Sequence, residues 1–345
     1  MTLVLCLAAA GCDQDKEDVT DSAVPDACGT LNPFEGDLIV AGDDMRAPMP
    51  AELAQAALAD LCREHNAITG DLVVSITNIP DLDALDCLCV VGGDLELYVN
   101  WELASIEGLS NLRSVGGTVL IAGTDDLVDL HGLEGLTEVT GELGVYSNWE
   151  LEDLSGLDNV AHVGDGLFLS DNALTSLSGL DRVQEIDGYL YVGWHADLPD
   201  LAGLDALARV GGLTEVRYND NLIDLSGLGE LRSVGGLALY ENPRLADLHG
   251  LERLEAVYGD VRVFDNDALG AVDGALSLAH VGGSLELSRN ARLFDLTDLH
   301  GVQRVQGDLL ILDNTSLTWD EAWLLMEAIG EENVDGEMVC EGNGA

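Results

Sequence analysis

Basic residues are scarce in this chain. Its 345 residues include only 14 Lys and Arg against 64 Asp and Glu, which gives a formal net charge of −50 at pH 7. Binding to phosphate backbones, anionic lipid or anionic polysaccharide requires clustered Lys and Arg. The composition therefore excludes nucleic acid as a partner and anionic polymers as direct ligands. So many carboxylates also oppose self-association.

Catalytic motifs and long apolar runs are missing as well. The sequence has no GxSxG, HExxH, P-loop or dinucleotide-binding fingerprint. After the first residues, no segment approaches the ~20 apolar residues of a membrane span. The seven histidines stand at loop offsets, which predicts solvated side chains. The sequence favours a protein that is not an enzyme; an exported carbohydrate-active enzyme, using a pair of carboxylates, is the less favoured alternative.

A repeat of 23 or 24 residues fills most of the chain. Spacing so regular is typical of a solenoid, whose units are too small to bury their own apolar face. In the copy that starts at Val91, Leu95 and Leu97 are two residues apart and indicate a strand. Gly and Ser then separate apolar residues spaced by three, which indicates turns. The copies open at Ile68, Val91, Val115, Val139, Val163, Ile186, Val210, Val234, Val257, Val281 and Val305.

Helices are predicted only at the two ends, where a solenoid must cover its last apolar coil. The first spans about residues 50–64, and we expect it to bury one face formed by Leu53, Ala57, Leu58 and Leu61. The second begins with a capping box from Thr318 to Glu321 and stops at Gly330. Its large apolar residues are expected to contact the last coil; they are Trp319, Trp323, Leu324 and Met326.

One polar position recurs as regularly as the leucines. An asparagine follows the first strand of most copies, and its amide can both donate and accept hydrogen bonds where the coil turns. A row of glycosylation acceptors is the alternative, but only the last member has the N-x-[ST] form. We therefore predict a structural asparagine ladder, formed by Asn100, Asn148, Asn172, Asn219, Asn242, Asn266, Asn290 and Asn314.

The recurring pattern GDLxLxxNxxLxxLxGLxxLxxVGG resembles the repeat of receptor L domains, the leucine-rich-repeat-like solenoids also found in bacterial cell-surface lipoproteins. The resemblance covers about residues 28–340. It implies a mainly β fold, a right-handed β-solenoid of about eleven coils with parallel sheets and a capping helix at each end. Because this family is defined by its scaffold, the resemblance implies no single chemistry.

The first residues indicate the cellular location of the protein. The stretch LAAAGC resembles a bacterial lipobox, which would make residues 1–11 a signal peptide and Cys12 the lipidated N-terminus. Its apolar run is short and no Lys or Arg precedes it. The acidic residues 12–27 would form a flexible tether. The predicted organisation continues with an N-terminal cap (28–67), the repeats (68–317) and a C-terminal cap (318–345). We expect the protein to be exported and held at the cell envelope by its lipid anchor.

Cysteines are few, and their placement agrees with an exported protein. In the resembled domains a disulfide ties the N-terminal segment to the capping region, and Cys28 with Cys62 match that placement. Cys62 could instead reach Cys87 or Cys89, one coil further on. Cys340 would stand about 50 Å away along the stacked strands, which predicts a free or intermolecular thiol.

No cofactor is expected from the sequence, and no zinc-type cysteine pair is present. Weak calcium binding by adjacent carboxylates is the alternative. The pairs that suggest it are Asp125 with Asp126 and Asp265 with Asp267, although no twelve-residue calcium loop surrounds them.

Aromatic residues are also few, with 5 Trp, 7 Tyr and 4 Phe, yet most fall at similar offsets just after the strand begins. They are either cross-strand packing on an exposed sheet or a binding surface, because Tyr, Trp and Arg are enriched at binding hot spots. The sequence favours recognition of a cell-surface protein or glycan; a structural envelope component without a specific ligand is the alternative. The residues of this aromatic stripe are Tyr98, Trp101, Tyr146, Trp149, Phe168, Tyr191, Trp194, Arg217, Tyr218, Tyr240 and Phe264.

Overall fold

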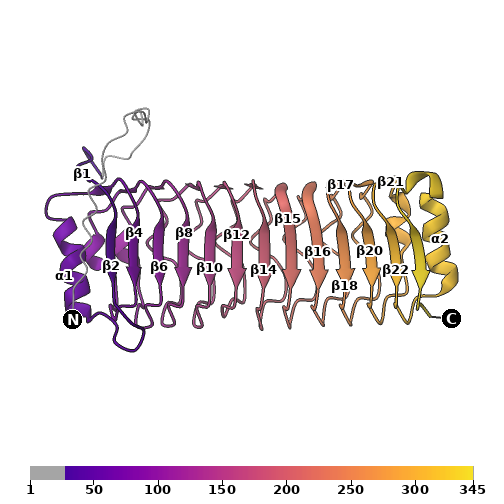
Figure 1. Cartoon of the computed structure of the whole chain (residues 1–345), viewed down its shortest axis with the longest axis horizontal. Helices are drawn as coiled ribbons and strands as arrows, with labels where there is room; N and C mark the ends of the chain where they lie inside the picture. Colours follow the sequence, from indigo (N-terminus) through magenta and orange to yellow (C-terminus); the bar gives the residue numbers. More distant parts are fainter. Residues whose placement is uncertain (1–27, 345) are drawn as a thin grey trace. The chain divides into compact units, whose positions relative to one another are not determined.

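The computed structural model describes residues 28–344. These residues form two compact units, the first ending at Val160 and the second beginning at Ala161. Both units are built from β-solenoid turns, about ten in all, with short parallel strands side by side (Figure 1). The predicted mainly β solenoid is therefore confirmed. The predicted signal peptide, Cys12 and the acidic tether lie outside the described residues.

In the first unit, most turns contribute a four-residue strand to one parallel sheet and a two-residue strand to a second. The order of pairing along the larger sheet is β2, β4, β6, β8 and β10. The elements are β1 (Pro33–Phe34), β2 (Leu38–Ala41), α1 (Ala51–Leu61), β3 (Ala67–Ile68), β4 (Leu72–Ser75), η1 (Asp83–Leu85), β5 (Val90–Val91), β6 (Leu95–Tyr98), η2 (Glu107–Leu109), β7 (Ser114–Val115), β8 (Val119–Ala122), β9 (Glu138–Val139) and β10 (Leu143–Tyr146).

The second unit repeats this arrangement, except that β15 and β16 run through both strand positions of their turns. Its elements are β11 (His162–Val163), β12 (Leu167–Ser170), β13 (Glu185–Ile186), β14 (Leu190–Gly193), β15 (Arg209–Arg217), β16 (Ser233–Tyr240), β17 (Ala256–Val257), β18 (Val261–Phe264), β19 (His280–Val281), β20 (Leu285–Ser288), η3 (Thr297–Gly301), β21 (Arg304–Val305), β22 (Leu309–Leu312), α2 (Trp319–Ile329), η4 (Glu331–Asn333) and β23 (Met338–Glu341).

The core of each unit is a stack of aliphatic side chains in register. On β6, Leu95 and Leu97 are fully buried while Glu96 and Tyr98 point outward, as the alternation predicts. Burial of one such leucine contributes about 1.5–3 kcal/mol. The turns are as tightly packed as the strands. A Cβ added to Gly227, at φ +106°, would lie 2.0 Å from the carbonyl oxygen of Leu201 in the preceding turn.

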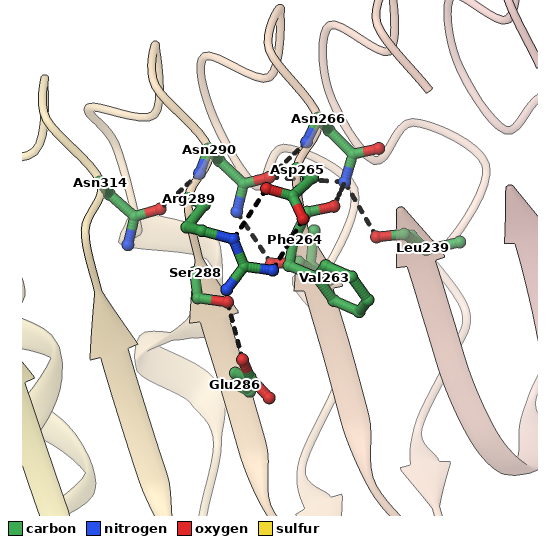
Figure 2. A network of polar contacts seen from close by, with 10 residues as sticks. All are labelled: Leu239, Val263, Phe264, Asp265, Asn266, Glu286, Ser288, Arg289, Asn290 and Asn314. Atoms are coloured by element: carbon green, nitrogen blue, oxygen red, sulfur yellow. Dashed lines mark hydrogen bonds and ion pairs between the residues drawn. The ribbon is translucent and has the colours of Figure 1, made fainter. Parts of the chain in front are cut away.

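The asparagine ladder follows the strands of the larger sheet. The Oδ1 atom of Asn266 accepts a hydrogen bond from the backbone N–H of Asn242 at 3.1 Å, and its Nδ2 donates to the Leu239 carbonyl at 2.9 Å. The N–H of Asn266 donates in turn to Asn290 (Figure 2). Asn100 and Asn148 make equivalent bonds in the first unit. The amides thus satisfy buried backbone groups at the corner of each coil.

Three coils use another residue in the ladder, and one further asparagine extends it. Thr77 and Thr124 occupy the position in the first unit and donate to the asparagine of the next coil. In the second unit His195 occupies it, and its Nδ1 lies 3.2 Å from the carbonyl oxygen of Asn172. Asn343 continues the ladder beyond Asn314. The expectation that the histidines are solvated is wrong for His195, which is fully buried.

The residue before each ladder position has a left-handed backbone. At most of these corners a side chain other than glycine adopts φ near +55°, which costs about 1 kcal/mol or more per residue. The ladder hydrogen bonds hold the chain in this conformation. The residues concerned are Ile76, Val99, Ser147, Asp171, Trp194, Tyr218, Glu241, Asp265, Arg289 and Asp313.

The helix α1 lies at the N-terminal end of the first unit, and its buried face differs from the prediction. Ala54, Leu58 and Leu61 are buried, whereas Leu53 is exposed and Ala57 only half-buried. Ala54 takes the place expected for Leu53 because the spacing of four and three residues keeps Ala54, Leu58 and Leu61 on one helix face.

The helix α2 caps the C-terminal end of the second unit. The Oγ1 of Thr318 accepts from the Glu321 N–H at 3.2 Å, but the Glu321 carboxylate accepts from the Leu296 N–H, so the capping box is not reciprocal. Gly330 ends the helix as predicted. The buried face consists of Ala322, Leu325 and Ile329.

The large apolar residues of α2 were predicted to contact the last coil, and that prediction is wrong for most of them. Trp319, Trp323 and Leu324 are exposed, and Met326 is half-buried. Trp323 and Met326 line an open hollow beside β23 instead. Ala322, Leu325 and Ile329 lie on one helix face, whereas Trp319, Trp323 and Met326 have a similar spacing but lie on another.

Two disulfides tie the N-terminal cap to the first turns. Cys28 bonds to Cys89 and Cys62 to Cys87, with Cα atoms 6.0 and 5.5 Å apart. The pairing of Cys28 with Cys62 is therefore wrong, and the alternative in which Cys62 reaches the next coil is the one found. The solenoid explains the second bond, because Cys62 and Cys87 are 25 residues apart and residues about one repeat apart lie side by side. Cys340 on β23 is a free thiol.

Neither helix in residues 28–344 has the length and apolar character needed to cross a membrane.

We predict that Asn266→Ala lowers the free energy of unfolding by about 2–5 kcal/mol, because it leaves the buried N–H of Asn242 and carbonyl of Leu239 unpaired. Urea denaturation monitored by circular dichroism measures the change. The exposed neighbour Asp267→Ala is the control and should change stability by less than about 0.5 kcal/mol. Equal effects of the two substitutions would contradict a stabilising ladder.

We predict that His195→Asn protects the protein from acid. Burial lowers the pKa of His195 to about 4, from 6.5 in an unfolded chain. The unfolded chain therefore binds more protons between these values, and the stability supplied by neutral His195 is lost as the pH falls through that window. From about pH 7 to about pH 4.5 the wild type should lose ~2–3 kcal/mol more than the variant. Parallel urea curves that show the same acid loss in both proteins would contradict this assignment.

Candidate functional site

In the second unit, the outward face of the larger sheet carries stacked aromatic rings. Phe168 and Tyr191 are paired across β12 and β14, and their ring centroids are 4.5 Å apart. Tyr240 and Phe264 are paired across β16 and β18 at the same distance. In-register parallel strands lie about 4.8 Å apart. Neighbouring rings at one strand position therefore stack as a direct consequence of the repeat.

Arg217 joins the two ring pairs. Its Nε donates to the Tyr191 hydroxyl at 2.9 Å and its Nη1 to the Tyr240 hydroxyl at 2.5 Å. The guanidinium carbon lies 5.0 and 5.5 Å from the two ring centroids, which is cation–π geometry. Glu215, two residues earlier on β15, pairs with the guanidinium at 3.1 Å. The sheet face thus holds one cation between two tyrosines and a carboxylate.

The Tyr240 hydroxyl also donates to Glu215 at 2.6 Å. Burial of the ring, together with this bond to a carboxylate, raises the pKa of Tyr240 to about 12. Tyr240 is therefore neutral at physiological pH and acts as a hydrogen-bond donor. Glu215 was not among the predicted site residues, although strand alternation places it on the same face as Arg217.

The corner after each strand presents a second row of rings. Trp194 and Tyr218 both have a left-handed backbone and stack at 4.2 Å. Tyr218 meets Tyr240 edge-on at 5.9 Å. Trp194 nevertheless keeps 53% of its surface exposed. The strained corners therefore project large aromatic side chains from a rigid position toward solvent.

At the C-terminal side of this face, a second arginine lies over an aromatic ring. Arg289 makes two hydrogen bonds to the Asp265 carboxylate, at 2.8 and 2.7 Å, and its guanidinium carbon lies 5.3 Å from the Phe264 centroid (Figure 2). Asp265 was a candidate for weak calcium binding with Asp267, but its oxygens are bound to Arg289. Arg289 and Asp265 both occupy left-handed corners, which the repeat alone does not reveal.

The first unit holds the remaining residues of the stripe. Tyr98 and Tyr146 occupy the same strand position on β6 and β10, with Ala122 of β8 between them. This replacement of a ring by a methyl group leaves a hollow of about 460 Å³ on the surface. Trp149 is 68% exposed and Trp101 half-buried on the corner loops.

The stripe therefore contains two kinds of residue. Tyr191 is only 7% exposed, and Arg217 is engaged on several sides, so both take part in packing. Trp149 and Trp194 are accessible to a partner. All of these residues were predicted to lie on one outward stripe, and their shared offset in the repeat does not separate packed from accessible rings.

Carboxylates do not gather into a metal site in the described part of the chain. Within residues 28–344, no group of three or more His, Cys, Asp or Glu side chains is arranged to hold a metal ion. The pKa of Asp125, the other calcium candidate, is raised by burial and by the neighbouring charge of Asp126.

No protein-family model and no curated protein matches this chain.

We predict that Arg217→Met destabilises the second unit by about 2–3 kcal/mol, because it removes two hydrogen bonds and the partner of the half-buried Glu215. Thermal or urea unfolding measures the loss. Arg262→Met is the matched control, since Arg262 pairs with Asp260 at an exposed site and should contribute less than about 0.5 kcal/mol. Similar losses for both variants would contradict the packing role of Arg217.

Proposed function

We propose that this protein is a non-enzymatic recognition protein of the cell surface, anchored by lipid, which binds a protein or glycan through the accessible part of the aromatic stripe. One observation carries the proposal. Trp194 is more than half exposed although it is stacked on Tyr218 and held by a strained backbone. An exposed, immobilised aromatic ring loses little conformational entropy on binding, and Trp and Tyr are the residues enriched at binding hot spots.

The rest of the surface supports this assignment of the stripe. The chain carries a net charge of −50, and most exposed positions of the repeats are acidic or small. Large exposed apolar side chains on a highly charged surface mark candidate interaction sites. The receptor L-domain resemblance agrees with a scaffold that displays a binding face rather than with a single catalytic centre.

The cellular location rests on different observations. The lipobox-like LAAAGC and the acidic segment after it favour an anchored, exported protein. The two disulfides of the N-terminal cap support export, because such bonds persist in oxidising compartments and are rare in the cytosol.

A structural envelope component is the second candidate. It is favoured by the hydrogen bonds that Arg217 donates to Tyr191 and Tyr240, because these polar atoms bind one another rather than a partner. In that case the rings would stabilise the sheet and would bind no partner.

We predict that Trp149→Ala combined with Trp194→Ala weakens partner binding at least tenfold, since each truncation of a hot-spot tryptophan costs about 2 kcal/mol. The full-length protein and the double variant would be screened on glycan arrays and against purified cell-surface proteins. Tyr258→Ala is the control, because Tyr258 is 71% exposed but lies outside the stripe. Unchanged binding in the double variant, or the absence of any partner, would favour the structural alternative.

A further inference from the structure

The hollow between Tyr98 and Tyr146 has walls of a defined separation. Both side chains stand at the same position on strands two apart, so their attachment points are about 10 Å apart. Ala122 lies between them, and Leu120 and Gly123 also line the hollow. The described strands thus form a slot between two tyrosines, here called the tyrosine slot, that is open to solvent.

In the second unit, an arginine occupies the repeat position of Ala122 and contacts two tyrosine rings. There the guanidinium of Arg217 lies 5.0 Å from the ring of Tyr191 and 5.5 Å from that of Tyr240. Tyr240 lies on the next strand at the position of Arg217, as Tyr146 does for Ala122, whereas Tyr191 lies on the preceding strand two residues earlier, where the slot has Glu96. In the slot, rings whose attachment points are about 10 Å apart leave room for one planar cation about 5 Å from each. In the repeat, Arg217 stands immediately before Tyr218-Asn219, and Ala122 stands in the same place before Gly123-Thr124. In the slot, Tyr98 and Tyr146 lie on the strands on either side of Ala122, which stands where the second unit has its arginine.

A carboxylate also lies at the tyrosine slot, but on the strand before Ala122 rather than on the same strand, where Glu215 lies relative to Arg217. Glu96 lines the slot and stands at the repeat position of Glu215, the carboxylate that pairs with Arg217. Burial raises the pKa of Glu96, and the nearby charges of Asp94 and Asp71 raise it further. Within residues 28–344, Glu96 makes no ion pair. An incoming cation would relieve this repulsion.

We propose that the tyrosine slot binds the guanidinium of an arginine in an exposed basic segment of a partner protein. The inference rests on the proposed recognition function and gives the chemistry of its partner. Arginine fits better than a neutral ring because it satisfies both the tyrosine faces and the Glu96 carboxylate. It fits better than a sugar because the strongest feature of the slot beyond its rings is unpaired negative charge. The net charge of the chain favours association with a basic segment.

The test uses the full-length protein and blocked pentapeptides, acetyl-Gly-Gly-Xaa-Gly-Gly-amide, titrated by ligand-observed NMR. Xaa is arginine in the probe and citrulline, its uncharged isostere, in the control; further arms use the phenylalanine peptide and methyl β-glucoside. We expect the arginine peptide to bind at least about tenfold more tightly than the citrulline peptide.

Ala122→Phe is the decisive variant. It fills the slot with a ring, as Phe264 stacks on Tyr240 at the same strand position, and leaves the net charge unchanged. We expect it to abolish binding of the arginine peptide, and Glu96→Gln to weaken binding severalfold without altering the fold measured by circular dichroism. Tyr258→Ala, at an exposed tyrosine of the second unit, should bind like the wild type.

Binding of the arginine peptide that survives both Ala122→Phe and Glu96→Gln would overturn the inference, because it would reflect general attraction to an acidic surface. Binding of the glucoside or the phenylalanine peptide in preference to the arginine peptide would also overturn it, while the recognition function would stand. If the screen finds a partner whose binding depends on Trp149 and Trp194, and the arginine peptide does not bind, the inference is overturned and the recognition function stands. The absence of any partner or bound probe would remove both.

Discussion

The asparagine ladder at the corner of the coils is the interaction on which the rest of the structure depends. Each coil must turn sharply after its strand, and at most corners a residue other than glycine has φ near +55°. The buried amides compensate for this strain by satisfying the backbone of two coils, as Asn266 does for Asn242 and Leu239. The same corners then orient Trp194, Tyr218 and Arg289, so the surface chemistry is set by a structural requirement.

The surface of this protein is mostly acidic, and its aromatic rings are concentrated in one part of it. The carboxylates keep most of it hydrated, and the rings concentrate at two outward strand positions and at the corner after the strand. In-register parallel pairing converts these sequence offsets into stacks such as Tyr240 on Phe264. A single change in the row has a large effect for the same reason. Arg217 in one coil produces a satisfied cation site, and Ala122 in another produces a hollow.

Much of the fold could be predicted because the recurring apolar positions of the repeat indicate directly which side chains are buried. The two-residue spacing of Leu95 and Leu97 indicates a strand with one face buried in the core. The recurring asparagine marks the corner after that strand. Predictions failed where the repeat ends. Leu53 and Trp323 are apolar residues of the capping helices, and a helix pattern alone did not show which face meets the coil. His195 was misjudged because its offset in the repeat, rather than its residue type, places it in the ladder, where its N–H donates to Asn219.

The sequence by itself determined the period, the parallel strands, the ladder and the sign of the surface charge, because these follow from local patterns repeated many times. Only the tertiary structure decided the disulfide pairing, since Cys28 and Cys62 each had partners at comparable sequence distance and the coil path selects among them. It also decided which aromatic residues are packed and which are accessible. Tyr191 and Trp194 are three residues apart, but stacking and hydrogen bonds across neighbouring coils bury the first and leave the second exposed.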